Sequence, residues 1–146
     1  MERKVKNAFK TGAISTEFIA NSIAKHQSKT NIGAHDIFLG QVRADKVEGK
    51  TVKAIEYTAY EKMANEKLHE IRETAFKEFH LTCLHIYHSL GKVVVGEICL
   101  FVFVSSPHRH EVFEALHQIV EKIKKEVPIF GKELFKDDSY QWKVNT

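Results

Sequence analysis

The strongest pattern of apolar and polar positions lies in residues 105–133, which read SSPHRHEVFEALHQIVEKIKKEVPIFGKE. Apolar residues recur there at helical spacing and form a single stripe: Val112, Leu116, Ile119, Val120, Ile123 and Val127. Ser105 or Ser106 suits the N-cap, Pro107 suits the first turn, and Pro128 stops the helix. The pattern predicts an amphipathic helix of about five turns that begins beside a His-Arg pair.

Two more helices are predicted upstream. Ser15 or Thr16 can cap a helix that runs to His26. Residues 60–79 carry a second strong amphipathic pattern. Its apolar side is formed by Tyr60, Met63, Ala64, Leu68, Ile71, Ala75 and Phe79. We expect this whole side, Met63 included, to face the core.

The other apolar runs have the character of strands. We expect strands in residues 5–14, 33–42, 51–58, 81–87, 92–105 and 140–144. A turn at Leu90-Gly91 separates two of them, and residues 44–50 form a charged loop. The run 92–105 is apolar on both faces, which suits a strand at the centre of a sheet.

This order of helices and strands is typical of an α+β fold with a mixed or mainly antiparallel sheet. The absence of a glycine-rich turn between a strand and a helix argues against a Rossmann fold. The chain has 146 residues and shows no internal repeat or linker. We therefore predict one domain that covers residues 1–146.

Composition narrows the class of protein. Apolar residues make up 43% and charged residues 28%, which is ordinary for a soluble globular chain. The formal charge of +3 suits an acidic partner or a phosphorylated substrate, but acidic residues interleave with the lysines, so we expect no nucleic-acid binding. The longest apolar run, Ile98–Val104, is too short to span a membrane. Cys83 and Cys99 are isolated, which predicts free thiols in a reducing cytoplasm.

Metal binding and hydrolytic chemistry find little support in the spacing of the histidines. His85 and His88 stand three apart in a strand, so their side chains point to opposite faces. His108 and His110 stand two apart in a helix and diverge by about 200°. No Cys/His set has zinc spacing and no GxSxG motif occurs, so we predict neither a metal site nor a serine hydrolase.

What remains is a set of cations: Arg43, His108, Arg109, Lys124 and Lys132. Arginine binds phosphate with two hydrogen bonds, whereas lysine supplies a point charge or a proton. His108 and Arg109 stand where a helix start attracts anions. Lys124 falls beside the apolar stripe, so it either reaches past that stripe to water or is desolvated, with a lowered pKa.

Five segments carry a family resemblance: Gly33–Arg43, Ile55–Ala64, Ile86–Gly96, Val104–Glu114 and Ile123–Glu133, followed by Trp142. In this order and spacing, over nearly the whole chain, they resemble the large, catalytic subunit of molybdopterin synthase. The resemblance implies an α/β-hammerhead fold with an additional small antiparallel sheet. It also implies a homodimer within a heterotetramer, and no cofactor.

The activity implied by the resemblance is sulfur transfer. A small ubiquitin-like subunit brings sulfur as a thiocarboxylate on its C-terminal Gly-Gly tail. The large subunit uses this sulfur to convert cyclic pyranopterin monophosphate (precursor Z) into molybdopterin, which carries a dithiolene. Such an enzyme needs no catalytic cysteine.

The resemblance also assigns roles. Gln41, Val42 and Arg43 match the substrate-contacting end of a strand. His108 and Arg109 match an anion-binding pair that reaches the pocket from the other protomer. Lys124 matches the lysine near the partner's tail, with a role in stabilising an oxyanion or moving protons. Gly131 and Glu133 fall in the closing substrate-binding motif, together with the catalytic candidate Lys132.

The sequence departs from the family pattern at three positions. Gly131 stands where the family has a catalytic lysine, and Lys132 either replaces that lysine or lies on the surface. Ser89 replaces an arginine, and Thr58 replaces a glutamate. These departures keep an alternative open, a degenerate homologue that only binds the small subunit or a pterin phosphate. A general anion-binding or nucleic-acid-binding module, with steep salt dependence, is the third possibility.

Overall fold

The computed structural model describes residues 5–144, within which the chain forms three helices and eight strands. Their bounds, in chain order, are β1 Phe9–Thr11, α1 Thr16–His26, β2 Ala34–Gln41, β3 Lys46–Val47, β4 Lys50–Ala59, α2 Glu61–Glu78, β5 Cys83–Val94, β6 Ile98–Ser106, α3 Arg109–Glu126, β7 Ile129–Phe135 and β8 Tyr140–Trp142. No helix in this part of the chain is both long and apolar enough to cross a membrane.

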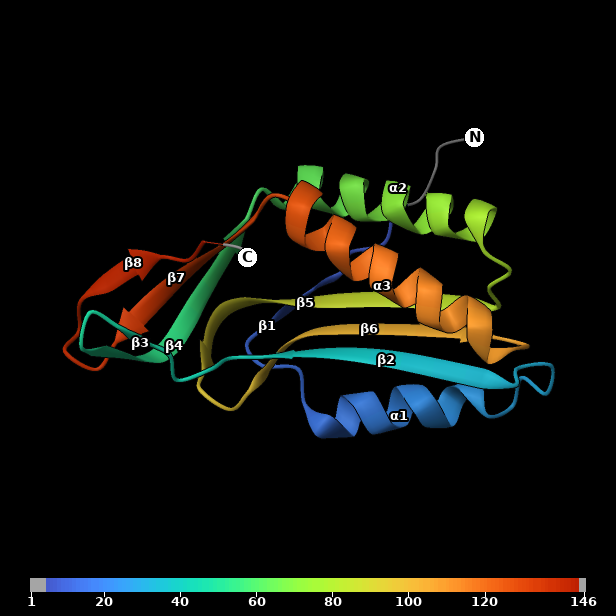
Figure 1. The fold of residues 1–146 in the computed structure, drawn as a ribbon, viewed down its shortest axis with the longest axis horizontal. Helices are drawn as coiled ribbons and strands as arrows, with labels where there is room; N and C mark the ends of the chain where they lie inside the picture. Colours follow the sequence, from blue (N-terminus) through green and yellow to red (C-terminus); the bar gives the residue numbers. More distant parts are fainter. Residues whose placement is uncertain (1–4, 145–146) are drawn as a thin grey trace.

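The strands form one mixed sheet in the order β2-β6-β5-β4-β7-β8, with β1 beside β5 and β3 beside β4. Among the described strands, β1 and β5 make the one parallel pair. Helices α2 and α3 cover one face of the β2-β6-β5 region and α1 covers the other, while β3, β4, β7 and β8 extend to one side (Figure 1). The predicted α+β class is confirmed.

Strand β6 lies at the centre of the core, as its two apolar faces predict. Leu100, Val102 and Val104 belong to the main cluster, which includes the apolar stripes of α2 and α3. Phe101 and Phe103 point the other way and pack with Ile14 and Ile19 beneath α1. Each of these five β6 side chains is 0% exposed. Burial on both faces fixes the register of the strand, and so the position of every site attached to the sheet.

The predicted turn at Leu90-Gly91 is wrong. Strand β5 continues through it, pairing with β6 as far as His88 and with β4 from Gly91 onward. Gly91 has φ +84°, which lets the strand bend where it changes partners. The actual hairpin turn lies after Val94 and contains Gly96 with φ +91°.

Two details of the helices also differ from prediction. Ser105 and Ser106 stay in β6, fully buried and paired with β2, so α3 begins later, at Arg109, with His108 as its N-cap. Tyr60 is 64% exposed and Met63 is 60% exposed, so neither is a core residue. Tyr60 is the N-cap of α2 and Met63 lies in its first turn, whereas Ala64 is the first residue of this helix that is buried in the core.

Candidate active site

The C-terminal end of α3 lies over a small pocket that contains Lys124. Four other residues that matter to its chemistry line it from separate elements: Tyr57 in β4, His88 in β5, Gly131 in β7 and Lys143 just after β8. We call this the lysine pocket; Ile123, Val127 and Ile129 complete its wall. Its volume is about 30 Å³, room for one or two small groups.

A helix end and a strand junction build the pocket. Helix α3 stops at Glu126, and Pro128 turns the chain directly into β7. Gly131 in β7 pairs with Tyr57 on one side. On its other side, the Lys143 N–H donates to the Gly131 carbonyl at 2.8 Å. The sheet thus brings residues 57, 131 and 143 together beneath Lys124.

The lysine pocket is cationic because its two titratable groups other than lysine, Tyr57 and His88, are held neutral. Burial lowers the pKa of Lys124, and the nearby charge of Lys143 lowers it further, while Cys99 acts in the opposite direction. Burial is also the main cause that lowers the pKa of His88 to about 4, and Lys124 adds to it. Burial raises the pKa of Tyr57 far above its usual value, and the Tyr57 hydroxyl donates to Cys99 Sγ at 3.3 Å. Of the two alternatives for Lys124, its place in this pocket favours partial desolvation.

His88 predicts a pH dependence of stability. Its folded pKa is lowered from 6.5 to about 4, so the unfolded chain takes up a proton first as the pH falls. The stabilising contribution of neutral His88 is full above pH 6.5 and is lost towards pH 4, by about 3 kcal/mol in the free energy of unfolding. His88→Gln should flatten this dependence in urea titrations. His110→Gln, at an exposed position, should leave it unchanged; equal slopes in both variants would contradict the assignment.

Lys132 does not line the lysine pocket. Successive residues of a strand point to opposite faces, so Lys132 faces away from Gly131. Its ammonium lies 4.2 Å from the ring centroid of Tyr140 and 5.8 Å from that of Trp142. Glu133 returns to the face of Gly131, is only 7% exposed, and accepts a hydrogen bond from Gln141 Nε2 at 3.1 Å.

The other predicted site residues lie apart from this pocket. Gln41, Val42 and Arg43 follow one another at the end of β2, where Val42 is buried and the Arg43 side chain is 72% exposed beside Asp45. His108 and Arg109 stand at the opposite end of α3, about 22 Å from Lys124 along the helix axis. Within one chain the predicted residues therefore form separate groups.

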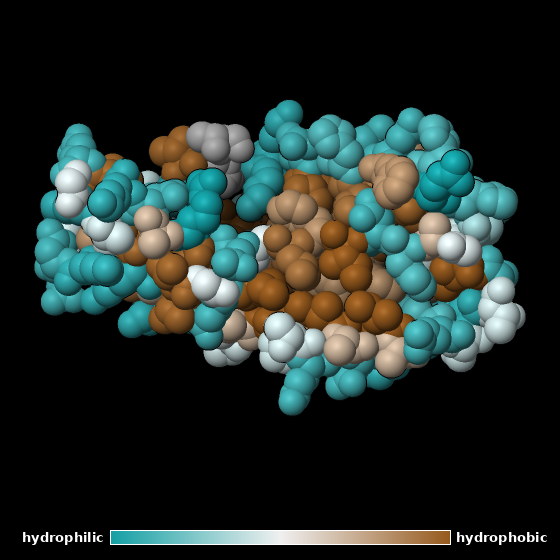
Figure 2. All heavy atoms as spheres, turned by 60° about the horizontal axis from the view of Figure 1, so that its bottom comes forward, coloured by the Kyte–Doolittle hydropathy of each residue, from teal (hydrophilic) through white to brown (hydrophobic). Residues whose placement is uncertain are grey.

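A surface next to β2 suggests how a partner could bring these separate groups of residues together. Strand β2 is the last strand at its end of the sheet, so its outer edge has no neighbour in the described chain. Figure 2 shows apolar side chains gathered over β2 and the adjoining side of α3. Two exposed apolar residues belong to these elements: Leu39 in β2, at 42% exposure, and Phe113 in α3, at 57%. Phe38 and Leu116 line a hollow between the two elements. An apolar patch beside an open strand edge marks an interaction surface.

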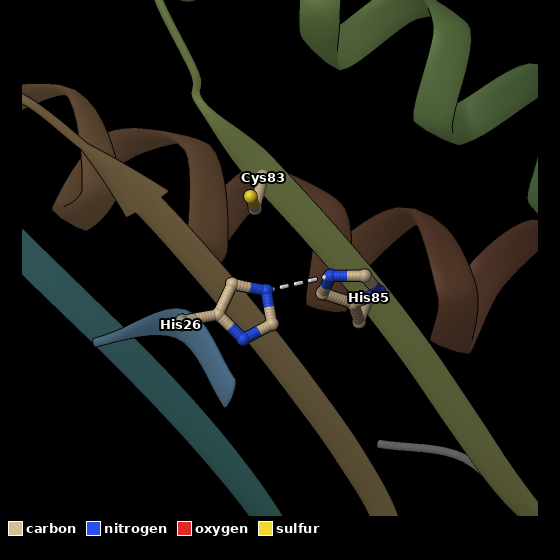
Figure 3. A group of neighbouring side chains, drawn as sticks. All are labelled: His26, Cys83 and His85. Carbon is tan, nitrogen blue, oxygen red and sulfur yellow. Dashed lines mark hydrogen bonds between the residues drawn. The ribbon is translucent and has the colours of Figure 1, made fainter. Parts of the chain in front are cut away.

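The structure gathers one cluster that sequence spacing does not reveal (Figure 3). His26, from the last turn of α1, points to His85 on β5, with Cys83 nearby on the same strand. The Nδ1 of His26 lies 2.6 Å from the Ser22 carbonyl and its Nε2 lies 2.9 Å from Nε2 of His85. Because a carbonyl oxygen can only accept, we assign the tautomers in which His26 Nδ1 donates to the Ser22 carbonyl and His85 Nε2 donates to His26 Nε2.

This cluster favours packing over metal binding. Lys29 donates to Cys83 Sγ at 2.9 Å, so each of the three side chains has a partner without a metal ion. Burial is the first cause that lowers the pKa of His85 to about 4, and the charges of Lys6, Arg72 and Lys29 contribute. An incoming cation would meet the same three charges. We assign the cluster to the attachment of α1 to the sheet.

Comparison with known proteins identifies the family. The family model described as "MoaE protein" matches residues 13–126. The chain belongs to the MoaE family. It is 38% identical over 128 residues to molybdopterin synthase catalytic subunit 1 of Aedes aegypti, covering 86% of this chain and 80% of that protein. It is 42% identical over 115 residues to the molybdopterin synthase catalytic subunit of Drosophila willistoni, covering 77% of this chain but 31% of that longer protein.

Solved structures of MoaE-type proteins share the fold. Molybdopterin synthase from Staphylococcus aureus superposes with a TM-score of 0.80 at 29% identity, covering 98% of this chain and 99% of that one. A complex of subunits 1 and 2 of the molybdopterin-converting factor from Helicobacter pylori gives 0.78 at 21% identity, covering 92% and 87%. The expected kinship with a sulfurtransferase of molybdenum-cofactor biosynthesis is confirmed. The roles of individual site residues stay predictions.

Proposed function

We propose that this chain carries out the sulfur transfer of a molybdopterin synthase, from the thiocarboxylated tail of a small partner to cyclic pyranopterin monophosphate. The observation that carries the proposal is the lysine pocket. Its two lysines favour an anion, and its volume of about 30 Å³ suits a terminal carboxylate-sized group but excludes a pterin. The slender end of an extended Gly-Gly tail fits this space, and the pterin then binds outside it.

The chemistry follows from where the sulfur starts. The thiocarboxylate sulfur attacks a carbon of the pterin substrate that carries an oxygen substituent. The carbon–sulfur bond forms, the carbon–oxygen bond breaks and the oxygen leaves with a proton, which gives a thioester between substrate and tail. Water then attacks the acyl carbon through a tetrahedral oxyanion; the tail leaves as a carboxylate and the sulfur stays on the substrate. Lys124 stabilises the oxyanion with its charge or donates a proton, which its lowered pKa favours. Cys83 and Cys99 are buried and take no part.

A second protomer completes the site in this proposal. The patch over β2 and α3 buries itself against the same patch of another copy, in a two-fold dimer. His108 and Arg109 of that copy then bind the phosphate of the pterin held near Lys124, with Arg43 as a further cation. One small subunit at each end gives a heterotetramer; the Helicobacter pylori complex of subunits 1 and 2 supports the pairing of the two kinds of subunit. The hammerhead fold and a cytoplasmic location belong to the same proposal.

Reconstitution tests the proposal. The purified chain, its thiocarboxylated small subunit and cyclic pyranopterin monophosphate should yield dithiolene product. The same small subunit with an ordinary carboxylate terminus is the control and should yield none. Tight binding of the small subunit without product would instead support the degenerate homologue that Gly131 suggests.

A further inference from the structure

Lys143 enters the lysine pocket from a strand that sequence reasoning did not connect to Lys124. Strands β7 and β8 pair from Leu134↔Tyr140 to Lys132↔Trp142, and the hydrogen bond between Lys143 and Gly131 continues this ladder by one more pair. Directly opposed residues place their side chains on the same face of a sheet. Lys143 therefore lies on the Gly131 face, which is the face turned towards Lys124.

The lack of a side chain at position 131 leaves the space that Lys143 uses. A Cβ added to Gly131 would lie 3.0 Å from Ile55 Cγ2 and 3.3 Å from a ring carbon of Tyr57, which is tighter than ordinary packing. It would also lie 3.6 Å from the Cβ of Lys143, so a side chain at 131 would run beside the Lys143 stem. The family resemblance expects a lysine at position 131, and in this chain the side chain of Lys143, opposite Gly131, lies beside that space.

Lys132 cannot serve the same space from its observed position. It faces the other side of β7, where its ammonium interacts with the rings of Tyr140 and Trp142. Bringing it to Lys124 would require a one-residue shift of β7 between β4 and β8. Such a shift would turn Glu133 and Phe135, both buried, to the opposite face.

We propose that Lys143 is the second catalytic lysine of the pocket, binding the anionic end of the partner's tail together with Lys124. This inference rests on the proposed function. Lys124 and Lys143 both line this small pocket and their charges repel each other, so a bound carboxylate or thiocarboxylate relieves the repulsion. During hydrolysis of the thioester, Lys143 holds the charge of the acyl oxygen, while Lys124, whose pKa is lowered by burial, supplies the proton.

The first test needs no substrate. Competitive labelling of the free protein with acetic anhydride across a pH series, read by peptide mass spectrometry, gives the apparent pKa of Lys124. Lys143→Met keeps an unbranched stem of similar bulk without the charge, and it should raise the Lys124 pKa. Lys132→Met is the matched control and should leave that pKa unchanged. An unchanged pKa in Lys143→Met, or an equal shift in both variants, would overturn the pairing.

The second test is turnover in the reconstituted system. Lys143→Met should lower the rate about a hundredfold at saturating small subunit, as expected when one oxyanion-stabilising group is lost. Lys132→Met should stay within about twofold, since its ammonium faces away from the pocket. Lys143→Arg, which retains the charge, should keep the Lys124 pKa low and recover part of the rate; this separates the charge from a defect in folding. Full turnover by Lys143→Met, or its loss in Lys132→Met alone, would refute the role.

Failure of the inference and failure of the proposed function give different results. A wild-type chain that makes no product, but whose Lys124 pKa responds to Lys143→Met, would leave the lysine pair intact and remove the sulfur transfer. An active wild-type chain whose Lys143→Met variant is equally active would support the sulfur transfer and remove the catalytic role of Lys143.

Discussion

Lys124→Ala should abolish nearly all turnover, with a loss of about a thousandfold, or about 4 kcal/mol of transition-state stabilisation. The reason is its position: it is the ammonium held over the lysine pocket by the last turn of α3, where burial strengthens every electrostatic interaction. Single-turnover assays with a saturating thiocarboxylated small subunit measure the loss in the chemical step.

The matched control for this variant is one residue away. Lys125 belongs to the same turn, but its side chain is 75% exposed and lies near Glu121. Lys125→Ala should therefore keep wild-type turnover within about twofold. Lys124→Ala should unfold at the same temperature as wild type or slightly higher, because it removes a desolvated charge that faces Lys143. Retention of a tenth or more of the activity by a folded Lys124→Ala protein would remove this residue from the catalytic role.

A mixture of two inactive variants should regain activity. The substitutions Lys124→Ala and Arg109→Ala affect residues that lie about 22 Å apart in one chain. In the proposed dimer, Lys124 of one chain and Arg109 of the other come together in one site across the two-fold axis. In a mixed dimer, one site combines the intact Lys124 of one chain with the intact Arg109 of the other. Random assortment gives about a quarter of wild-type activity, since half of the dimers are mixed and each has one intact site.

Co-expression of the two variants with different affinity tags, followed by tandem purification, isolates the mixed dimer. A mixture of Lys124→Ala with Lys143→Met is the control: both substitutions fall in the same pocket, so each site of the mixed dimer keeps one defect. It should regain no activity. No recovery in the Lys124→Ala and Arg109→Ala pair would show that each site is built within a single protomer. Recovery in the control would show that Lys124 and Lys143 act from different protomers, which would contradict the shared pocket.

Local chemistry made α1 and α2 predictable. Ser15 caps α1 by accepting a hydrogen bond from the Phe18 N–H, as its place before the apolar pattern indicates. The amphipathic run of α2 predicts its bounds to within one residue at each end. The hairpin turn was less predictable, because Gly91 and Gly96 both adopt positive φ, one at a bend and one at a turn. Residue type alone does not distinguish these two uses of glycine.

The lysine pocket depends on contacts that are distant in sequence. Strand β7 was not predicted, because Pro128 and Gly131 suggest a loop, whereas pairing with β4 some 75 residues upstream makes the segment a strand. That pairing decides which of two adjacent positions, 131 or 132, faces the pocket. The pairing of β8 then decides that Lys143 joins it. The position of Lys124 beside the apolar stripe could be predicted, because it depends only on the spacing of residues within one helix.

The cross-strand pair of Gly131 and Lys143 bears on how this family is followed through evolution. A charge can move from one strand to the next and still occupy nearly the same place in space, since directly opposed residues in a sheet lie about 5 Å apart. An alignment column that scores only position 131 would count this chain among inactive descendants. Homologues with glycine at 131 should carry lysine at 143, and those with lysine at 131 should be free to vary there. In such lineages we expect the position of the ammonium in the pocket to be conserved, while the residue type at any one alignment position changes.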